Sequence, residues 1–272
     1  MAAGSLRLLL PLDGSSEAES VLAAVLPLAD RRPLRLTLLS AIPKSAGRAA
    51  AEAYLDRAMR ALRRPDVEVR VESCLGDPAS AIISHAVSER ADLIAMTTHG
   101  RSGLRRLLMG SVTEKVLRQA PFPLITCRPG CRMEGWAHVV ALDGSPRAES
   151  ILDDILPLTR LLGATLHLLH VRSGPTASDA ANSLKRAARH GADAGVQVLA
   201  EIREGEPTRE ILRYADDVRA GLVALASHGR TGLDRALMGS VAEEVLRKTT
   251  CPVLLRREIR RTSPLAGAGK RS

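Results

Sequence analysis

The residue pattern most able to do chemistry is a glycine-bearing segment that occurs twice in the chain. Residues 98–118 read THGRSGLRRLLMGSVTEKVLR and residues 227–247 read SHGRTGLDRALMGSVAEEVLR, with 15 of the 21 aligned positions identical. The identities include a His-Gly-Arg triplet and a Met-Gly-Ser-Val run, whereas a core would tolerate any well-packed apolar set. The repetition of particular glycines and of a serine indicates that each copy forms a site, and its chemistry suits an anion.

Each copy is predicted to be a loop that leads into the first turn of a helix. Glycine allows the backbone to approach a ligand closely, and free N–H groups at a helix start bind phosphate with help from the helix dipole. A loop arginine would add positive charge, and a loop histidine would shape the loop or line the phosphate pocket. The N–H donors expected in the two copies belong to Gly110, Ser111, Val112, Gly239, Ser240 and Val241.

A structural interpretation competes with the anion site. Ser111 and Glu114 have the S-x-x-E spacing of a capping box, and their second-copy counterparts have it too. Such a cap contributes roughly 1 kcal/mol and explains the serine and the glutamate. It does not explain Gly100, Gly103 and Gly110, each of which recurs in the second copy. We therefore favour the anion site over a purely structural loop.

The duplication extends along the whole chain. Asp13-Gly14-Ser15 recurs as Asp143-Gly144-Ser145 at an offset of 130. This period is too long for a solenoid repeat and matches the size of a domain. Either aspartate is a turn residue before glycine or a carboxylate that accepts hydrogen bonds from a ribose or a base edge. The expected parts are a first domain at 1–130, a linker at 131–135, a second domain at 136–256 and a basic, disordered tail at 257–272.

Apolar runs alternate with helical patterns in both halves, which predicts an α/β fold with a parallel sheet. We expect two tandem Rossmann-like, doubly wound domains, each with a five-stranded, mainly parallel sheet. Ligands bind such sheets at the carboxyl ends of the strands where the strand order reverses, here between the first and fourth strands. Ser16 and Glu19 have capping-box spacing at the first helix. The strands are expected at 6–12, 34–42, 67–75, 93–97, 122–128, 138–142, 165–171, 196–203, 222–226 and 253–256, and further helices at 46–62 and 78–90 and from residue 111.

Composition narrows the function classes. The chain of 272 residues carries a net charge of +9 and has no apolar run long enough to span a membrane. Its four aromatic residues are too few for a nucleic-acid stacking platform. Four cysteines without a Cys-x-x-Cys pair, together with an N-terminus unlike a secretory signal, favour a cytoplasmic protein with free thiols. No paired carboxylates or nucleophile elbow appear, so the sequence indicates a binding protein before an enzyme.

These residues resemble the universal stress protein family in its tandem, two-domain form, over residues 5–128 and 136–256. The signature of nucleotide-binding members is G-x-x-G-x9-G-[S/T]. Gly100 with Gly110-Ser111, and Gly229 with Gly239-Ser240, match its later part. The first glycine of the signature is replaced by Thr97 in one half and by Ala226 in the other.

The resemblance implies an ATP-binding stress-response or signalling module, with Mg²⁺ accompanying the triphosphate and no dedicated metal ligands or catalytic residues. Asp234 replaces Arg105 in the second loop, which favours tighter binding by the first half. The alternatives are a nucleotide-free interaction module and a slow ATPase. The expected nucleotide-binding residues are Pro11, Leu12, Asp13, Ala41, Thr97, His99, Gly100, Arg101, Gly103, Gly110, Ser111, Val112, Ala141, Leu142, Asp143, Val171, Ala226, His228, Gly229, Arg230, Gly232, Gly239, Ser240 and Val241.

The resemblance also implies an arrangement of the two domains. Members of the family pair through their last strands, here 124–127 and 253–256, which would relate the two domains by a pseudo-twofold axis. Such pairing would cover two sheet edges that would otherwise be exposed. A homodimer of the whole chain is a further expectation.

Overall fold

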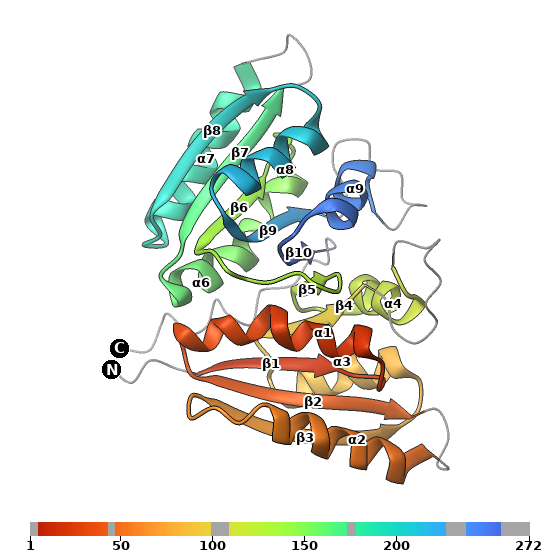
Figure 1. Cartoon of the computed structure of the whole chain (residues 1–272). Coiled ribbons are helices and arrows are strands. Elements are labelled where there is room, and N and C mark those ends of the chain that lie inside the picture. The colour runs from red at the N-terminus through yellow and green to blue at the C-terminus, as the bar shows by residue number, and fades with distance from the viewer. Residues whose placement is uncertain (1–4, 43–46, 99–108, 173–177, 227–237, 257–272) are drawn as a thin grey trace. The chain divides into compact units, whose positions relative to one another are not determined.

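The computed structural model describes residues 5–42, 47–98, 109–172, 178–226 and 238–256. It contains two compact units, residues 1–131 and 132–272, and each is an α/β unit with alternating strands and helices (Figure 1). Among the described residues, no helix is both long and apolar enough to cross a membrane.

The first unit is a five-stranded parallel sheet in the order β3-β2-β1-β4-β5. The order reverses between β1 and β4, so α1 and α2 cover one face of the sheet and α3 and α4 the other (Figure 1). Its elements are β1 (Leu6–Pro11), α1 (Ser16–Val25), the 3₁₀-helix η1 (Leu26–Asp30), β2 (Leu34–Ile42), α2 (Arg48–Ala61), β3 (Val67–Leu75), α3 (Pro78–Ser88), β4 (Leu93–Thr97), α4 (Ser111–Gln119) and β5 (Leu124–Cys127).

The second unit repeats this plan with the strand order β8-β7-β6-β9-β10, again parallel throughout. Helices α6 and α7 lie on one face and α8 and α9 on the other (Figure 1). Its elements are β6 (Ala137–Ala141), α5 (Pro146–Glu149), α6 (Leu152–Leu162), β7 (Thr165–Arg172), α7 (Ser178–Asp193), β8 (Val198–Glu204), α8 (Pro207–Asp217), β9 (Ala220–Ala226), α9 (Ser240–Lys248) and β10 (Val253–Arg256).

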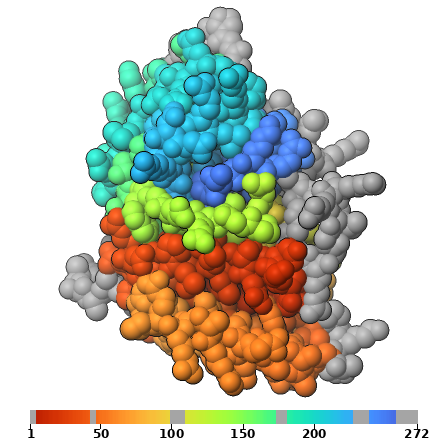
Figure 2. Space-filling view, in the orientation of Figure 1, coloured from red at the N-terminus to blue at the C-terminus, as the bar shows by residue number. Residues whose placement is uncertain are grey.

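The predicted α/β class and parallel sheets are confirmed. The strands could be predicted from the sequence because their buried positions form apolar runs. Every residue of β4 is buried, and β1 alternates only weakly because helices cover both of its faces. Helix α1 packs Ala18, Val21 and Val25 inward. Its other side lies at the surface of the unit (Figure 2), and Glu17 and Glu19 are exposed.

The start of α1 corrects the predicted capping box. The cap is Ser15, whose backbone is extended and whose hydroxyl accepts a hydrogen bond from Ala18 N at 3.1 Å. Ser16 is already helical and therefore cannot act as the cap. Gly14 has a φ of 85°, and this left-handed conformation turns the chain from β1 into the cap.

The core of the second unit differs from that of the first by a buried histidine. His138 on β6 is fully buried, and its Nδ1 lies 2.8 Å from the hydroxyl of Thr159. Thr159 donates its single proton to the carbonyl of Ile155 at 2.7 Å, so His138 is the donor through Nδ1. Its Nε2 is buried and has no hydrogen-bond partner among the described residues. Burial, with a smaller contribution from the nearby His167, lowers the pKa of His138 to about 3.

We expect His138 to make the stability of the second unit depend on pH. The unfolded chain binds a proton near pH 6.5 whereas the folded unit resists it, so stability is complete above that pH and falls as the solution is acidified toward pH 3. At pH 5 the loss from this residue should be about 2 kcal/mol. The counterpart in the first unit is the buried Leu8, so His138→Leu should remove that part of the loss.

Urea unfolding at pH 8 and pH 5, followed by fluorescence of the single tryptophan, Trp136, measures this effect within the second unit. His190→Asn changes an exposed histidine of the same unit and should behave like the unaltered protein. An equal acid-induced loss in the unaltered protein and in His138→Leu would contradict the assignment.

Candidate functional site

A cavity of about 520 Å³ lies in the first unit at the carboxyl ends of β1, β2 and β4. It opens where the strand order reverses, so residues from both helical layers reach it. Eight of the residues expected at the first site line it together, namely Pro11, Leu12, Asp13, Ala41, Thr97, Gly110, Ser111 and Val112. His99, Gly100, Arg101 and Gly103 lie outside the described residues.

The carboxylate of Asp13 is held in a fixed turn at the end of β1. Its Oδ1 accepts hydrogen bonds from the backbone N of Ser15 at 3.0 Å and from the Ser15 hydroxyl at 2.6 Å. The same hydroxyl caps α1, so strand end, turn and helix start form one connected unit. Asp13 thus has the turn role that the sequence offered, and it also lines the cavity. Its role as a hydrogen-bond acceptor for a ribose or a base edge stays a prediction.

The two ends of the first glycine loop are pinned to each other. Gly110 N donates to the carbonyl of Thr98 at 2.6 Å, and the buried hydroxyl of Thr113 donates to the carbonyl of Thr97 at 3.1 Å. These bonds hold the first turn of α4 against the end of β4. The N-terminal N–H groups of a helix have no intrahelical partner, so this turn presents donors at the cavity wall.

The predicted capping box at Ser111 and Glu114 is wrong. Gly110 is the cap residue, with an extended backbone at φ −67° and ψ 151°, and Ser111 is the first helical residue. The second copy is alike, with Gly239 as the cap at φ −71° and ψ 153°. A capping side chain must come from the extended residue before the helix, so neither serine can serve. The structural interpretation therefore loses the feature that supported it.

One wall of the cavity was missed by the sequence reasoning. It is formed by α2 and the residue before it, through Gly47, Ala50, Ala51 and Tyr54. These positions follow the i, i+3, i+4, i+7 spacing of one helical face. That spacing was visible in the sequence, but a face of small residues also suits ordinary packing. The other lining residues that were not expected are Ala18, Leu39, Ser40, Ile42, Pro78, Ile82, Met96 and Thr113.

The second unit repeats the strand-end geometry. Asp143 Oδ1 accepts from Ser145 N at 2.9 Å and from the Ser145 hydroxyl at 2.6 Å, as Asp13 does in the first unit. The expected residues described there are at the ends of β6, β7 and β9 and the start of α9, namely Ala141, Leu142, Asp143, Val171, Ala226, Gly239, Ser240 and Val241. His228, Gly229, Arg230 and Gly232 lie outside the described residues.

The two units differ at the end of their second strands, β2 and β7. Leu12 N donates to the carbonyl of Leu39, and Leu142 N donates to that of Leu169, both at 2.8 Å. The next residues, Ser40 and His170, are therefore counterparts. Ser40 lines the cavity of the first unit, whereas His170 is buried with its Nδ1 2.8 Å from the carbonyl of Leu142. The second unit thus places a hydrogen-bonded imidazole where the first has a small hydroxyl.

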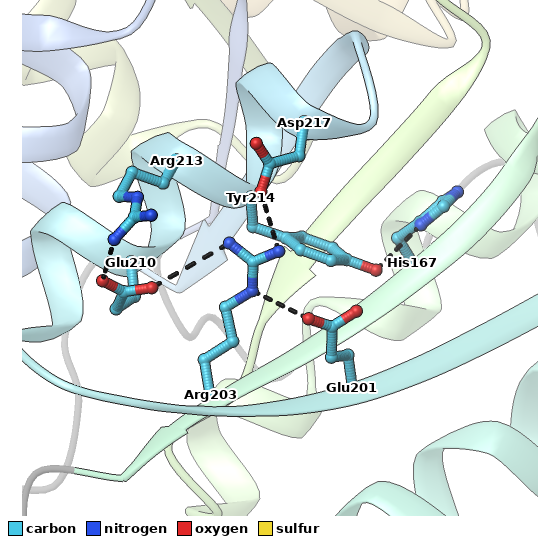
Figure 3. Close-up of polar contacts among 7 residues, drawn as sticks. All are labelled: His167, Glu201, Arg203, Glu210, Arg213, Tyr214 and Asp217. Carbon is cyan, nitrogen blue, oxygen red and sulfur yellow. Dashed lines mark hydrogen bonds and ion pairs between the residues drawn. The ribbon is translucent and has the colours of Figure 1, made fainter.

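A polar cluster stabilises the outer part of the second unit (Figure 3). The guanidinium of Arg203 on β8 lies 4.7 Å from the ring centroid of Tyr214 on α8. It contacts Glu201 and Asp217 at 2.8 Å each and Glu210 at 3.9 Å. The hydrogen bond to Glu201 is the largest cause of a raised pKa of Arg203, and Asp217 raises it further.

The same cluster continues into the sheet (Figure 3). The Tyr214 hydroxyl lies 3.0 Å from Nδ1 of His167 on β7. Burial lowers the pKa of His167 and raises that of Tyr214. Arg203 and Tyr214 correspond to Cys74 and His85 in the first unit, so the cluster belongs to one copy. Among the described residues, no group of three or more His, Cys, Asp or Glu side chains could hold a metal ion.

Comparison with known proteins finds relatives across both units. The universal stress protein family matches residues 5–128 and 138–257. A universal stress protein of Methanocaldococcus jannaschii is 40% identical over 73 residues, a match that spans 27% of this chain and 43% of that protein. The universal stress protein E homolog of Haemophilus influenzae is 26% identical over 239 residues, spanning 76% of this chain and 74% of that protein.

A solved structure extends the likeness to the fold. The crystal structure of a universal stress protein from Archaeoglobus fulgidus superposes with a TM-score of 0.63. The two chains are 24% identical, and the match covers 93% of this chain and 97% of the other. The two chains therefore share the fold over nearly the whole length of each.

We expect Arg203→Met to destabilise the second unit by about 1–3 kcal/mol, because it removes the cation from three carboxylates and from the face of Tyr214. Urea unfolding at pH 7, followed by Trp136 fluorescence, measures the loss. Arg213→Met is the matched control, because Arg213 contacts Glu210 from an exposed position. Its effect should stay within about 0.5 kcal/mol. Equally small effects of both substitutions would show that the cluster contributes nothing.

Proposed function

Because the chain belongs to the universal stress protein family, we propose that its first unit binds an adenine nucleotide, ATP, as a stress-response or signalling module. The observation that carries the proposal is the cavity of about 520 Å³, whose lining includes both a carboxylate and a helix N-terminus. Small-molecule sites are typically about 300–1,000 Å³, mostly apolar, with a few placed polar groups. Alanine, isoleucine, proline and methionine side chains supply the apolar lining here.

The strand order suggests how the nucleotide lies. The phosphates would meet the N–H groups of Ser111 and Val112 at the start of α4, which follows β4. The base would lie beyond the end of β2, between Ala41 and the alanines of α2. Since β1 lies between β2 and β4, the ribose would pass over Asp13. Mg²⁺ would accompany the triphosphate through its oxygens without a protein cage of its own.

We further propose that the first unit holds the stronger site. His170 occupies the second crevice at the position where Ser40 lines the first, and its hydrogen bond to Leu142 fixes the ring there. A ligand entering the second crevice would have to displace this bond or avoid the ring. The replacement of Arg105 by Asp234 would act in the same direction, although both residues lie outside the described part of the chain.

Isothermal titration of nucleotide-free protein with ATP and Mg²⁺ tests the proposal. We expect one dominant site per chain, with affinity lowered at least about tenfold in Gly110→Val, because the added side chain enters the cavity wall beside the phosphates. The matched substitution Gly239→Val changes the cap of α9 and should leave the dominant site intact.

Three outcomes would count against the assignment. Binding that is lost in Gly239→Val but kept in Gly110→Val would move the dominant site to the second unit. Equal occupancy of two sites would contradict the proposed asymmetry. A protein that takes up no nucleotide would favour a partner-binding module in which the glycine loops are structural, an alternative supported by the buried Thr97 at the first position of the signature.

A further inference from the structure

Among the described residues of the first unit, Tyr54 carries a buried hydroxyl for which the fold supplies no hydrogen-bond partner of normal geometry. Tyr54 is 9% exposed and lines the cavity from α2. Its hydroxyl oxygen is buried and makes no hydrogen bond of normal geometry to any described residue. A buried hydroxyl that lacks a partner costs free energy, because it gives up its hydrogen bonds to water. The group is therefore placed to receive a partner from outside the protein.

The surroundings of this hydroxyl make it a hydrogen-bond donor. Burial raises its pKa well above the usual value, and Glu19 raises it further both by its charge and as a weak hydrogen-bond acceptor outside normal geometry. The charge of Asp13 acts in the same direction, because it also opposes a phenolate. The backbone of Gly14 lies beside it at the turn that follows β1. The hydroxyl thus stays protonated at neutral pH, next to the carboxylate that marks the end of β1.

The second unit supplies an internal comparison. Leu55 and Ala58 of α2 match Leu184 and Ala187 of α7 at an offset of 129, and all four are buried. This alignment makes Ser183 the counterpart of Tyr54. The Ser183 hydroxyl donates to Glu149 at 2.7 Å, and Arg186 contacts the same carboxylate oxygen at 2.7 Å.

At these two positions, one on the helix and one on the strand, the units place the larger and the smaller side chain in opposite order. The first unit has Tyr54 on its helix and Ser40 on its strand, whereas the second has Ser183 and His170. In the second unit both polar groups are hydrogen-bonded within the protein. In the first, Ser40 faces a cavity and Tyr54 has an unused donor. This difference points to a ligand contact that exists in the first unit alone.

We propose that the Tyr54 hydroxyl, together with the Asp13 carboxylate, recognises a sugar hydroxyl of the nucleotide and makes the first unit selective for ribonucleotides over deoxyribonucleotides. The inference rests on the proposed function of this cavity. A sugar hydroxyl donates one hydrogen bond and accepts others, which matches a carboxylate acceptor beside a phenol donor. The position agrees, because β1 lies between the strands assigned to the base and the phosphates.

The test is competitive titration of the full chain with Mg²⁺ and ATP, 2′-deoxy-ATP or 3′-deoxy-ATP. We expect the unaltered protein to prefer ATP to one of the two analogues by about tenfold, because a site built for a hydroxyl is left with unpaired buried groups without it. In Tyr54→Phe the affinity for ATP should fall about tenfold, to the level of that analogue, while the analogue binds as before. The analogue affected identifies the hydroxyl that is recognised.

Two controls separate recognition from packing. Ser183→Ala removes the counterpart hydroxyl in the second unit and should leave all three affinities unchanged. Thermal unfolding of Tyr54→Phe shows whether the fold is retained, since the substitution removes one oxygen atom and keeps the ring. A Tyr54→Phe variant with unchanged selectivity, or one in which all three affinities fall together, would overturn the role of Tyr54 while leaving nucleotide binding intact. A protein that binds none of the three nucleotides would overturn the proposed function as well.

Discussion

The candidate site depends on the reversal of strand order in the parallel sheet. In the first unit the chain moves outward from β1 to β2 and β3, then returns across the sheet to add β4 and β5. Right-handed connections place the outward and return helices on opposite faces. No helix can cover the carboxyl ends of both β1 and β4, so a crevice opens between them. Asp13 and the start of α4 both line this opening.

The duplication shows what this frame requires and what it leaves free. Both units keep the turn after the first strand, with the carboxylates of Asp13 and Asp143 bonded to serines two residues on. They also keep a glycine cap at the last helix. The side chains at the strand ends and on the neighbouring helix differ between the units, because they can change without altering the sheet. The second unit uses this freedom for internally bonded polar groups such as His170.

The sequence reasoning succeeded where periodicity reports burial directly. The strands at 34–42, 67–75 and 93–97 were predicted with the bounds that the structure has. It failed by one residue at helix caps, since a cap is defined by backbone dihedral angles and not by the spacing of a serine and a glutamate. It also missed the α2 wall, because an alanine-rich helical face has the same pattern whether it packs against a core or borders a cavity.

The amino-acid sequence by itself determined the α/β class, the tandem repeat and the two motifs that meet at the crevice, because periodic burial and repeated glycines are local signals. Only the tertiary structure decided that Tyr54 borders the cavity with an unused hydroxyl, and that His170 and Ser183 are bonded within the second unit. These contacts join residues far apart in the chain, and their geometry follows from how the helices pack on the sheet. Local sequence patterns therefore do not predict these contacts.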